Sequence, residues 1–226
     1  FCILPISRDA AKIEAMSPPT FANPRSAAAI GTHALQYLSG DGLLRLGVPV
    51  ALGGVGGGPT AVGEAARRLL VRDPAAAWVY RAQRLAIELL VHANNIGLRE
   101  HLLPQLLAGE RAGTVPMPME AHPLVAIEAG NAMRLYGQYS RVVNLQWVGF
   151  SVAVPIQAGA TVEWALLRGE EDGLRIGIDH GEPCPAGSRA ATLTFDGVFF
   201  RMDEWLGEAT LPQRVAPLAE VLAQAV

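Results

Sequence analysis

The spacing of hydrophobic residues changes character once along this chain, and that change constrains the possible folds most. Up to residue 109 the apolar residues recur at helical spacing, as in Val62, Ala65, Ala66, Leu69 and Leu70. From residue 132 on, β-branched and aromatic residues come in short runs that Gly, Asp and Pro separate. Helices followed by segregated strands predict an α+β protein or two separate domains.

Four helical segments are expected in the first half, over residues 26–39, from residue 60, over 74–92 and over 98–108. Thr60 and Asp73 are predicted N-caps, and Pro74 suits the first helical turn. Pro104 has no N–H to donate, so we expect it to divide the last segment and start a fresh turn. Gly109 is the expected left-handed residue at the C-terminal end of that segment.

The second half predicts antiparallel strands and a final helix. The expected strands cover residues 141–143, 150–156, 161–167, 174–178 and 191–200. In the last of these, Leu193 and Phe195 alternate with polar residues, which is typical of a half-buried antiparallel strand. Residues 217–226 are expected to form a helix that packs on nothing. We expect the change from helices to strands between residues 113 and 132.

Composition excludes several classes of function. The 226 residues carry a net charge of −3 and no basic patch, so nucleic acid is not an expected partner. No run of about 18 apolar residues occurs, so no membrane span is predicted. Cys2 and Cys184 form no disulfide framework, which is consistent with a reducing cytoplasm. None of the five histidines has metal-ligand spacing, so no metal site is predicted.

The glycine-rich segment at residues 53–58 has two interpretations. Backbone N–H groups of such a segment at a helix N-terminus could bind a phosphate. However, no preceding strand or βαβ unit is evident, and no Lys-Ser/Thr pair follows. The alternative is a flexible turn between two helices, and we favour it.

Four segments in order resemble the acyl-CoA dehydrogenase superfamily. Residues 97–110, Gly-Leu-Arg-Glu-His-Leu-Leu-Pro-Gln-Leu-Leu-Ala-Gly-Glu, are the most specific match, to a Leu-Pro-x-Leu-x-x-Gly-Glu segment. The others are residues 42–56 with their Pro and Gly-Gly-x-Gly turn, 135–138, and 195–208. The resemblance implies an all-α domain over residues 1–115, a small antiparallel β-barrel over 116–210, and a short C-terminal helix over 211–226.

The resemblance also implies a cofactor and a reaction, namely FAD-dependent desaturation of an acyl-CoA thioester between Cα and Cβ. The segments that match the family's flavin contacts provide Met117, Met119, Glu120, Arg141, Val142 and Val143. His122 falls in the matching substrate loop. The alternatives are a capping carboxylate for Glu120 and a hydrogen-bonded loop residue for His122, and we favour these simpler roles.

Several residues depart from the family pattern. Met119 and Val143 stand where the family has hydroxyls, and Arg141 stands where it has Trp. An Arg plane could still stack on a flavin. In the family, the catalytic carboxylate comes from a C-terminal helical bundle, for which this sequence provides no position. We therefore expect no catalytic residue within this chain.

Three functions are consistent with these sequence features. The first is an acyl-CoA dehydrogenase-like flavoprotein oxidoreductase of fatty acid metabolism. The second is a non-catalytic subunit or remnant of the family, with weak or no flavin binding, that acts through a partner. The third is a flavin-dependent oxidase or monooxygenase on the same scaffold. Because the helical half would expose an apolar surface, a homo-oligomer or a partner subunit is expected.

Overall fold

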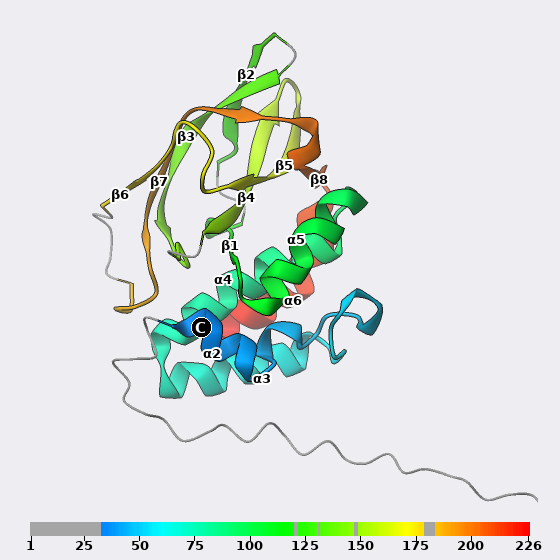
Figure 1. Ribbon diagram of the computed structural model, residues 1–226, viewed down its shortest axis with the longest axis vertical. Helices are drawn as coiled ribbons and strands as arrows, with labels where there is room; N and C mark the ends of the chain where they lie inside the picture. Colours follow the sequence, from blue (N-terminus) through cyan, green and yellow to red (C-terminus); the bar gives the residue numbers. More distant parts are fainter. Residues whose placement is uncertain (1–32, 120–121, 131, 147–148, 179–183) are drawn as a thin grey trace, which may run out of the picture.

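The computed structural model describes residues 33–119, 122–130, 132–146, 149–178 and 184–226. Helices come first, strands follow, and one long helix comes last (Figure 1). The α-helices are α2 (Ala34–Gly40), α3 (Pro59–Arg72), α4 (Pro74–Val91), α5 (Ile96–Ala108) and α6 (Leu211–Ala225). Short 3-10 helices occupy η1 (Leu43–Arg45), η2 (Val50–Leu52) and η3 (Met202–Glu204).

Local capping chemistry explains where the two central helices begin. The side chain of Asp73 accepts a hydrogen bond of 3.0 Å from the backbone N–H of Ala76, and Pro74 follows the cap directly. Asn95 caps α5 in the same way, accepting from Leu98 at 3.0 Å. Gly109 ends α5 in the left-handed conformation, with φ 68°. The expectations for Asp73 and Gly109 are confirmed.

Two local expectations about helices are wrong. The N-cap of α3 is Gly58 rather than Thr60, because Pro59 takes the first helical position and leaves Thr60 inside the helix. Pro104 lies inside a continuous α5, so it does not start a fresh turn. Residues 26–32 of the first expected helix lie outside the described residues.

One mixed sheet of eight strands follows the helices. Seven strands run in the order β6-β7-β3-β2-β4-β5-β8, and β1 pairs with β4 off this path. The pairs β1–β4 and β2–β4 are parallel, and the others are antiparallel. The strands are β1 (Ala112–Thr114), β2 (Leu124–Ala129), β3 (Ala132–Val142), β4 (Phe150–Ala158), β5 (Thr161–Arg168), β6 (Leu174–Gly177), β7 (Ala191–Phe200) and β8 (Trp205–Glu208).

The order of helices before strands is confirmed, but the expected antiparallel barrel is wrong. Among the described residues the sheet does not close, because β6 and β8 each pair along one side only. Both end strands have only four residues, which gives them little edge for mutual pairing. The parallel pairs arise because the short β1 and the start of β2 both lie against β4.

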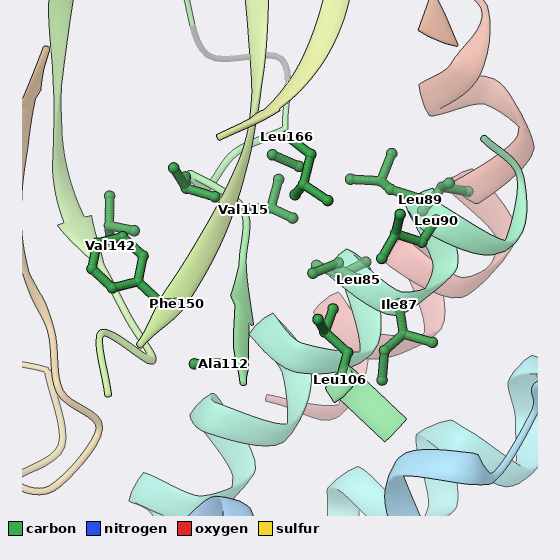
Figure 2. Close-up of a cluster of buried hydrophobic side chains, with 14 of the residues drawn as sticks. Leu85, Ile87, Leu89, Leu90, Leu106, Ala112, Val115, Val142, Phe150 and Leu166 are labelled. Carbon is green, nitrogen blue, oxygen red and sulfur yellow. The ribbon is translucent and has the colours of Figure 1, made fainter. Parts of the chain in front are cut away.

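The core lies between α4 and the sheet. Figure 2 shows Leu85, Leu89 and Leu90 of α4 near Val115 and Leu166 from the sheet side. These five side chains are at most 1% exposed. Helix α4 also contacts α2, α3, α5 and α6, and thirteen of its residues are buried. This central position makes α4 the element that the rest of the fold packs around.

Helix α6 returns to the helical layer after the sheet. It packs against α3 and α4, so the expectation that the final helix packs on nothing is wrong. The helix also begins at Leu211, six residues earlier than expected, and it contains Pro217. On α3, the buried Gly63 leaves room for Val221 of α6, because a Cβ at Gly63 would overlap with the Val221 Cγ1 atom. No helix in the described part of the chain is long and apolar enough to span a membrane.

Candidate functional site

A pocket of about 250 Å³ lies where α4 faces the segments that enter and leave the first strands of the sheet. Its helix side comes from α4. Its other side comes from the segment that follows β1 and from the end of β3. The lining residues are Trp78, Arg81, Ala82, Val115, Met117, Pro118, Arg141 and Val143.

Three of the residues predicted to contact a flavin meet at this pocket. Met117 and Val143 provide an apolar surface, and Arg141 adds a guanidinium group. Arg141 is exposed and has a left-handed backbone, with φ 54°. Although Met117 and Arg141 lie far apart in the sequence, the fold brings both to one pocket.

The other predicted site residues do not line the pocket. Val142 has no exposed surface, and it belongs to the hydrophobic cluster drawn in Figure 2. Met119 is half-buried against the core. His122 is exposed, and its backbone carbonyl accepts a hydrogen bond of 2.8 Å from the Tyr139 hydroxyl. Glu120 lies outside the described residues.

The helix side of the pocket was not predicted from the sequence. Trp78, Arg81 and Ala82 are three and four residues apart, which places them on one face of α4. A signal was present: Trp78 and Arg81 are large or charged residues in the middle of a helix rich in Ala and Leu. Nothing local in the sequence says that this face meets residues 115–143.

The electrostatics of the pocket are dominated by cations. Burial lowers the pKa of Arg81. Its Nη1 donates a hydrogen bond of 3.4 Å to the Val226 carbonyl, but its Nε is buried without a hydrogen-bond partner among the described residues. Arg141 adds a second guanidinium, and no described lining residue is a carboxylate. The pocket is therefore suited to a ligand that brings hydrogen-bond acceptors or negative charge.

A network of buried hydrogen bonds joins α4 to the chain segments on the other side of the pocket. Gln83, next to Ala82, donates to the carbonyls of Leu106 and Arg111 at 2.9 and 3.1 Å. Its Oε1 accepts from the N–H of Gly113 at 2.6 Å and from the side chain of Asn144 at 2.8 Å. Asn144 also donates to the Gly113 carbonyl at 2.8 Å. Each of these groups has a hydrogen-bond partner in the buried core, where an unpaired group would be costly.

The same network extends to the pocket lining itself. The Thr114 hydroxyl donates a hydrogen bond of 2.7 Å to the carbonyl of Val143. Thr114 precedes the lining residue Val115, so this bond joins two walls of the pocket. Gln146 donates to the Asn144 side chain at 3.1 Å. The pocket walls are thereby fixed by side-chain hydrogen bonds in addition to apolar packing.

The lining residues fit a flavin ring in chemical type. An isoalloxazine ring is flat and largely apolar, and carbonyl oxygens lie on its pyrimidine edge. The apolar lining side chains suit the flat faces, and the Arg141 guanidinium suits the acceptor edge. Ligand pockets typically measure about 300–1,000 Å³, so this one suits a single ring system better than a whole dinucleotide.

The glycine-rich segment forms a compact turn. Gly53, Gly56 and Gly57 have positive φ angles, and the N–H of Gly56 donates to the Val48 carbonyl at 2.9 Å. A Cβ at Gly54 would overlap with that same carbonyl. The glycines are therefore explained by backbone geometry, as the turn interpretation predicts. The described residues contain no group of three or more His, Cys, Asp or Glu that could hold a metal ion.

Comparisons with known proteins place this fold. No protein-family model and no curated protein matches the chain. Among solved structures, a glutaryl-CoA dehydrogenase from Mycobacterium smegmatis matches with TM-score 0.73 and 19% identity, over 86% of this chain and 53% of that one. An acyl-CoA dehydrogenase complexed with FAD from Bacillus anthracis matches with TM-score 0.68 and 19% identity, over 84% and 35%.

A third solved structure is the ChsE4–ChsE5 complex from Mycobacterium tuberculosis, which matches with TM-score 0.69 and 18% identity, over 91% of this chain and 63% of that one. In all three cases this chain spans less than two thirds of the matched chain. The matching parts are the N-terminal helices and the middle sheet. The chain therefore has the fold of the N-terminal and middle domains of the acyl-CoA dehydrogenases.

Proposed function

We propose that this chain is the cofactor-binding part of an acyl-CoA dehydrogenase-like flavoprotein, and that the pocket beside α4 binds the isoalloxazine ring of FAD. One observation carries the proposal: Met117, Arg141 and Val143, which the sequence predicts as flavin contacts, line one pocket. The fold, which FAD-binding acyl-CoA dehydrogenases share, supports it.

The proposed reaction is the desaturation of an acyl-CoA thioester between Cα and Cβ. Bound FAD would supply the hydride acceptor. The residues of this chain would hold and orient the ring: Arg141 donates to its acceptor edge, and Met117 and Val143 exclude water from its faces. No described lining residue is a carboxylate, so the group that removes the Cα proton is expected outside this lining.

A direct binding experiment tests the proposal. The full chain is titrated with FAD, FMN and riboflavin, and the flavin absorbance and fluorescence are followed. We expect saturable binding of all three. We expect Arg141→Met to weaken binding about tenfold, because a hydrogen bond from a charged group contributes about 1.5–3 kcal/mol. Arg175→Met, at an exposed arginine of β6 outside the lining, is the matched control.

Two results would contradict the proposal. The first is no binding at about 1 mM flavin, which corresponds to less than about 4 kcal/mol of binding free energy. The second is equal weakening by Arg141→Met and Arg175→Met, because that result would assign the effect to net charge rather than to the pocket.

A non-catalytic subunit is the second candidate function. Met117, Val143, Val115 and Pro118 bring no hydroxyl to the pocket, and Pro118 has no backbone N–H. One structure with this fold is a complex of two named chains, which favours association as a function for relatives of this scaffold. Light scattering tests association of this chain: a mass above one chain supports it, and a well-behaved monomer contradicts it. A cytoplasmic location stays a prediction.

A further inference from the structure

The segment between α4 and α5 is hydrogen-bonded to the last part of the sheet. The side-chain amide of Asn95 donates to the carbonyls of Asp203 and Trp205 at 3.2 and 3.1 Å. The backbone N–H of Asn94 donates to the Leu206 carbonyl at 3.1 Å. Helix α5 also contacts η3, and β8 follows η3 directly (Figure 1). These contacts join the helical layer to the sheet, and we call them the η3 junction.

A buried carboxylate lies within the η3 junction. Glu204 is the last residue of η3 and is 4% exposed. Its Oε2 accepts a hydrogen bond of 2.9 Å from the backbone N–H of Arg201. Its Oε1 is buried and has no hydrogen-bond partner among the described residues. Such a group is costly to bury when it is ionised, and much less costly when it is protonated.

The charges around Glu204 leave this cost only partly compensated. Arg201 Nη1 lies 3.8 Å from Glu204 Oε1, but it also lies 3.6 Å from Oε1 of the largely buried Glu171. Arg168, at the end of β5, pairs with the same Glu171 oxygen at 3.5 Å. Burial is the main cause that raises the pKa of Glu204, and the negative charges of Glu171 and Asp203 add to it. Two carboxylates therefore share the guanidinium of Arg201.

A second junction between the layers, beside the pocket, differs in chemistry. There the side chains of Gln83 and Asn144 bond to each other and to the backbone of Gly113, so its side-chain groups are neutral amides. Asn95 likewise brings a neutral amide to the η3 junction from the α5 side. Of the groups in these two junctions, Glu204 is the one whose raised pKa lies close to neutral pH.

We propose that the η3 junction is a pH-sensitive switch, which is closed while Glu204 is protonated and opens locally when Glu204 ionises. The ionised carboxylate regains water when η3 moves away from α5, and this movement breaks the hydrogen bonds of Asn94 and Asn95. Opening also loosens β8, which pairs with β5 alone among the described strands. The switch is independent of flavin binding, because it concerns a different contact between the layers from the one beside the pocket.

Hydrogen exchange of the full chain tests the switch. The amide of Asn94 is the direct probe, because its hydrogen bond to Leu206 breaks on opening. After correction for the intrinsic exchange rate, its opening constant should rise at least about tenfold from pH 5 to pH 7. The amide of Gly113, which donates to Gln83 in the other junction, is the control probe and should show no such rise.

Two variants assign the pH dependence to one carboxylate. Glu204→Gln is neutral at every pH, so the opening constant at Asn94 should stay within about twofold over the same range. Glu208→Gln, at an exposed carboxylate of β8, is the matched control and should keep the pH dependence of the wild type.

A second measurement uses the unchanged junction, in case Glu204→Gln does not fold. Trp205 is half-buried and follows Glu204 directly, so its emission should shift to longer wavelength as the pH rises from 5 to 8. Trp205→Phe should remove this shift.

Three results would overturn the proposal. The first is an opening constant at Asn94 that does not change with pH in the wild type. The second is the same pH dependence in Glu204→Gln, because another group would then titrate. The third is an equal loss of protection at Asn94 and Gly113, because that result would indicate global unfolding rather than a local switch.

Discussion

The side-chain amide of Asn144 donates a hydrogen bond of 2.8 Å to Oε1 of Gln83, and neither residue has any exposed surface. The bond joins α4 to the segment that follows β3, which are two walls of the pocket. Asn144 also has a left-handed backbone, with φ 66°, a conformation that Asn adopts more readily than most residues. Side-chain chemistry and backbone geometry therefore both favour Asn at this position.

Two substitutions at Asn144 separate these contributions. Asn144→Ala should reduce the free energy of unfolding by ~2–4 kcal/mol, because it leaves buried groups unpaired and places Ala at positive φ. Asn144→Gly relieves the backbone strain but still removes the amide, so it should recover only part of the loss. Urea unfolding measures both, with the exposed Asn94→Ala as control. Full recovery in Asn144→Gly would contradict a role for the amide.

Arg84 and Glu88 form an ion pair on α4, and both side chains are largely buried. Arg84 has no exposed surface, burial lowers its pKa, and its Nη2 lies 3.4 Å from Glu88 Oε2. Removing one partner of a buried pair leaves an uncompensated charge, so Glu88→Gln should cost ~3 kcal/mol of stability. Arg84→Met removes the charge and should cost less.

An exposed pair of the same spacing provides the control for this prediction. Arg68 and Glu64 lie 3.8 Å apart on α3, with both side chains more than half exposed. Glu64→Gln should therefore change stability by less than ~0.5 kcal/mol. Chemical unfolding of all three variants gives the ranking, and a larger loss in Arg84→Met than in Glu88→Gln would refute it.

Glu204 should make stability depend on pH. The pKa of Glu204 is raised to about 7, mainly by burial and also by the nearby Glu171 and Asp203, although hydrogen bonding and charge from Arg201 oppose the rise. Between its ordinary value of 4.5 and about 7, the folded state binds more protons than the unfolded state. The contribution of Glu204 is therefore fully present below pH 4.5 and is lost as the pH rises to 7.

Glu204→Gln isolates this contribution. Relative to the wild type, the variant should become more stable as the pH rises from 5 to 8, by at most ~3 kcal/mol. Thermal or urea unfolding at both pH values measures the change. Glu208→Gln, at an exposed carboxylate of β8, should show no such trend. A stability difference that is constant with pH would argue against a raised pKa.

The contact between α3 and α6 can be tested through Gly63 and Val221. Gly63→Ala would ordinarily stabilise a helix by up to about 1 kcal/mol. Here the added Cβ overlaps with Val221 Cγ1, so we expect a net loss of ~1–3 kcal/mol. Val221→Ala removes the clash and should restore stability in the double variant. Stabilisation by Gly63→Ala alone would show that α6 does not pack as described.

Features that depend only on residues close together in the sequence were predictable. The Asp73 cap, the Gly109 terminus and the strands near residues 150–158, 161–168 and 191–200 all follow from local propensity and alternation. Strand β2 was not predicted, because three prolines precede it and indicate irregular structure. Its pairing with β3 is not visible in the local sequence. The division at residues 1–115, 116–210 and 211–226 stays a prediction.

The candidate site was predictable only in part for the same reason. Met117, Arg141 and Val143 came from the resemblance and do meet at the pocket. Val142, the last residue of β3, is fully buried in the core, whereas Val143, just after the strand, lines the pocket. Trp78 and Arg81 were missed because their role depends on a long-range contact between α4 and the sheet, which no local pattern encodes.

The return of α6 to the helical layer also affects how the chain folds. Gly63 and Val221 are in contact although more than 150 residues separate them, and the whole sheet lies between them in the sequence. Closing so long a loop is entropically costly and slows the search for the native topology. Because α6 follows the sheet in the sequence and packs on α3 and α4, we expect the helices and the sheet to unfold in one cooperative transition.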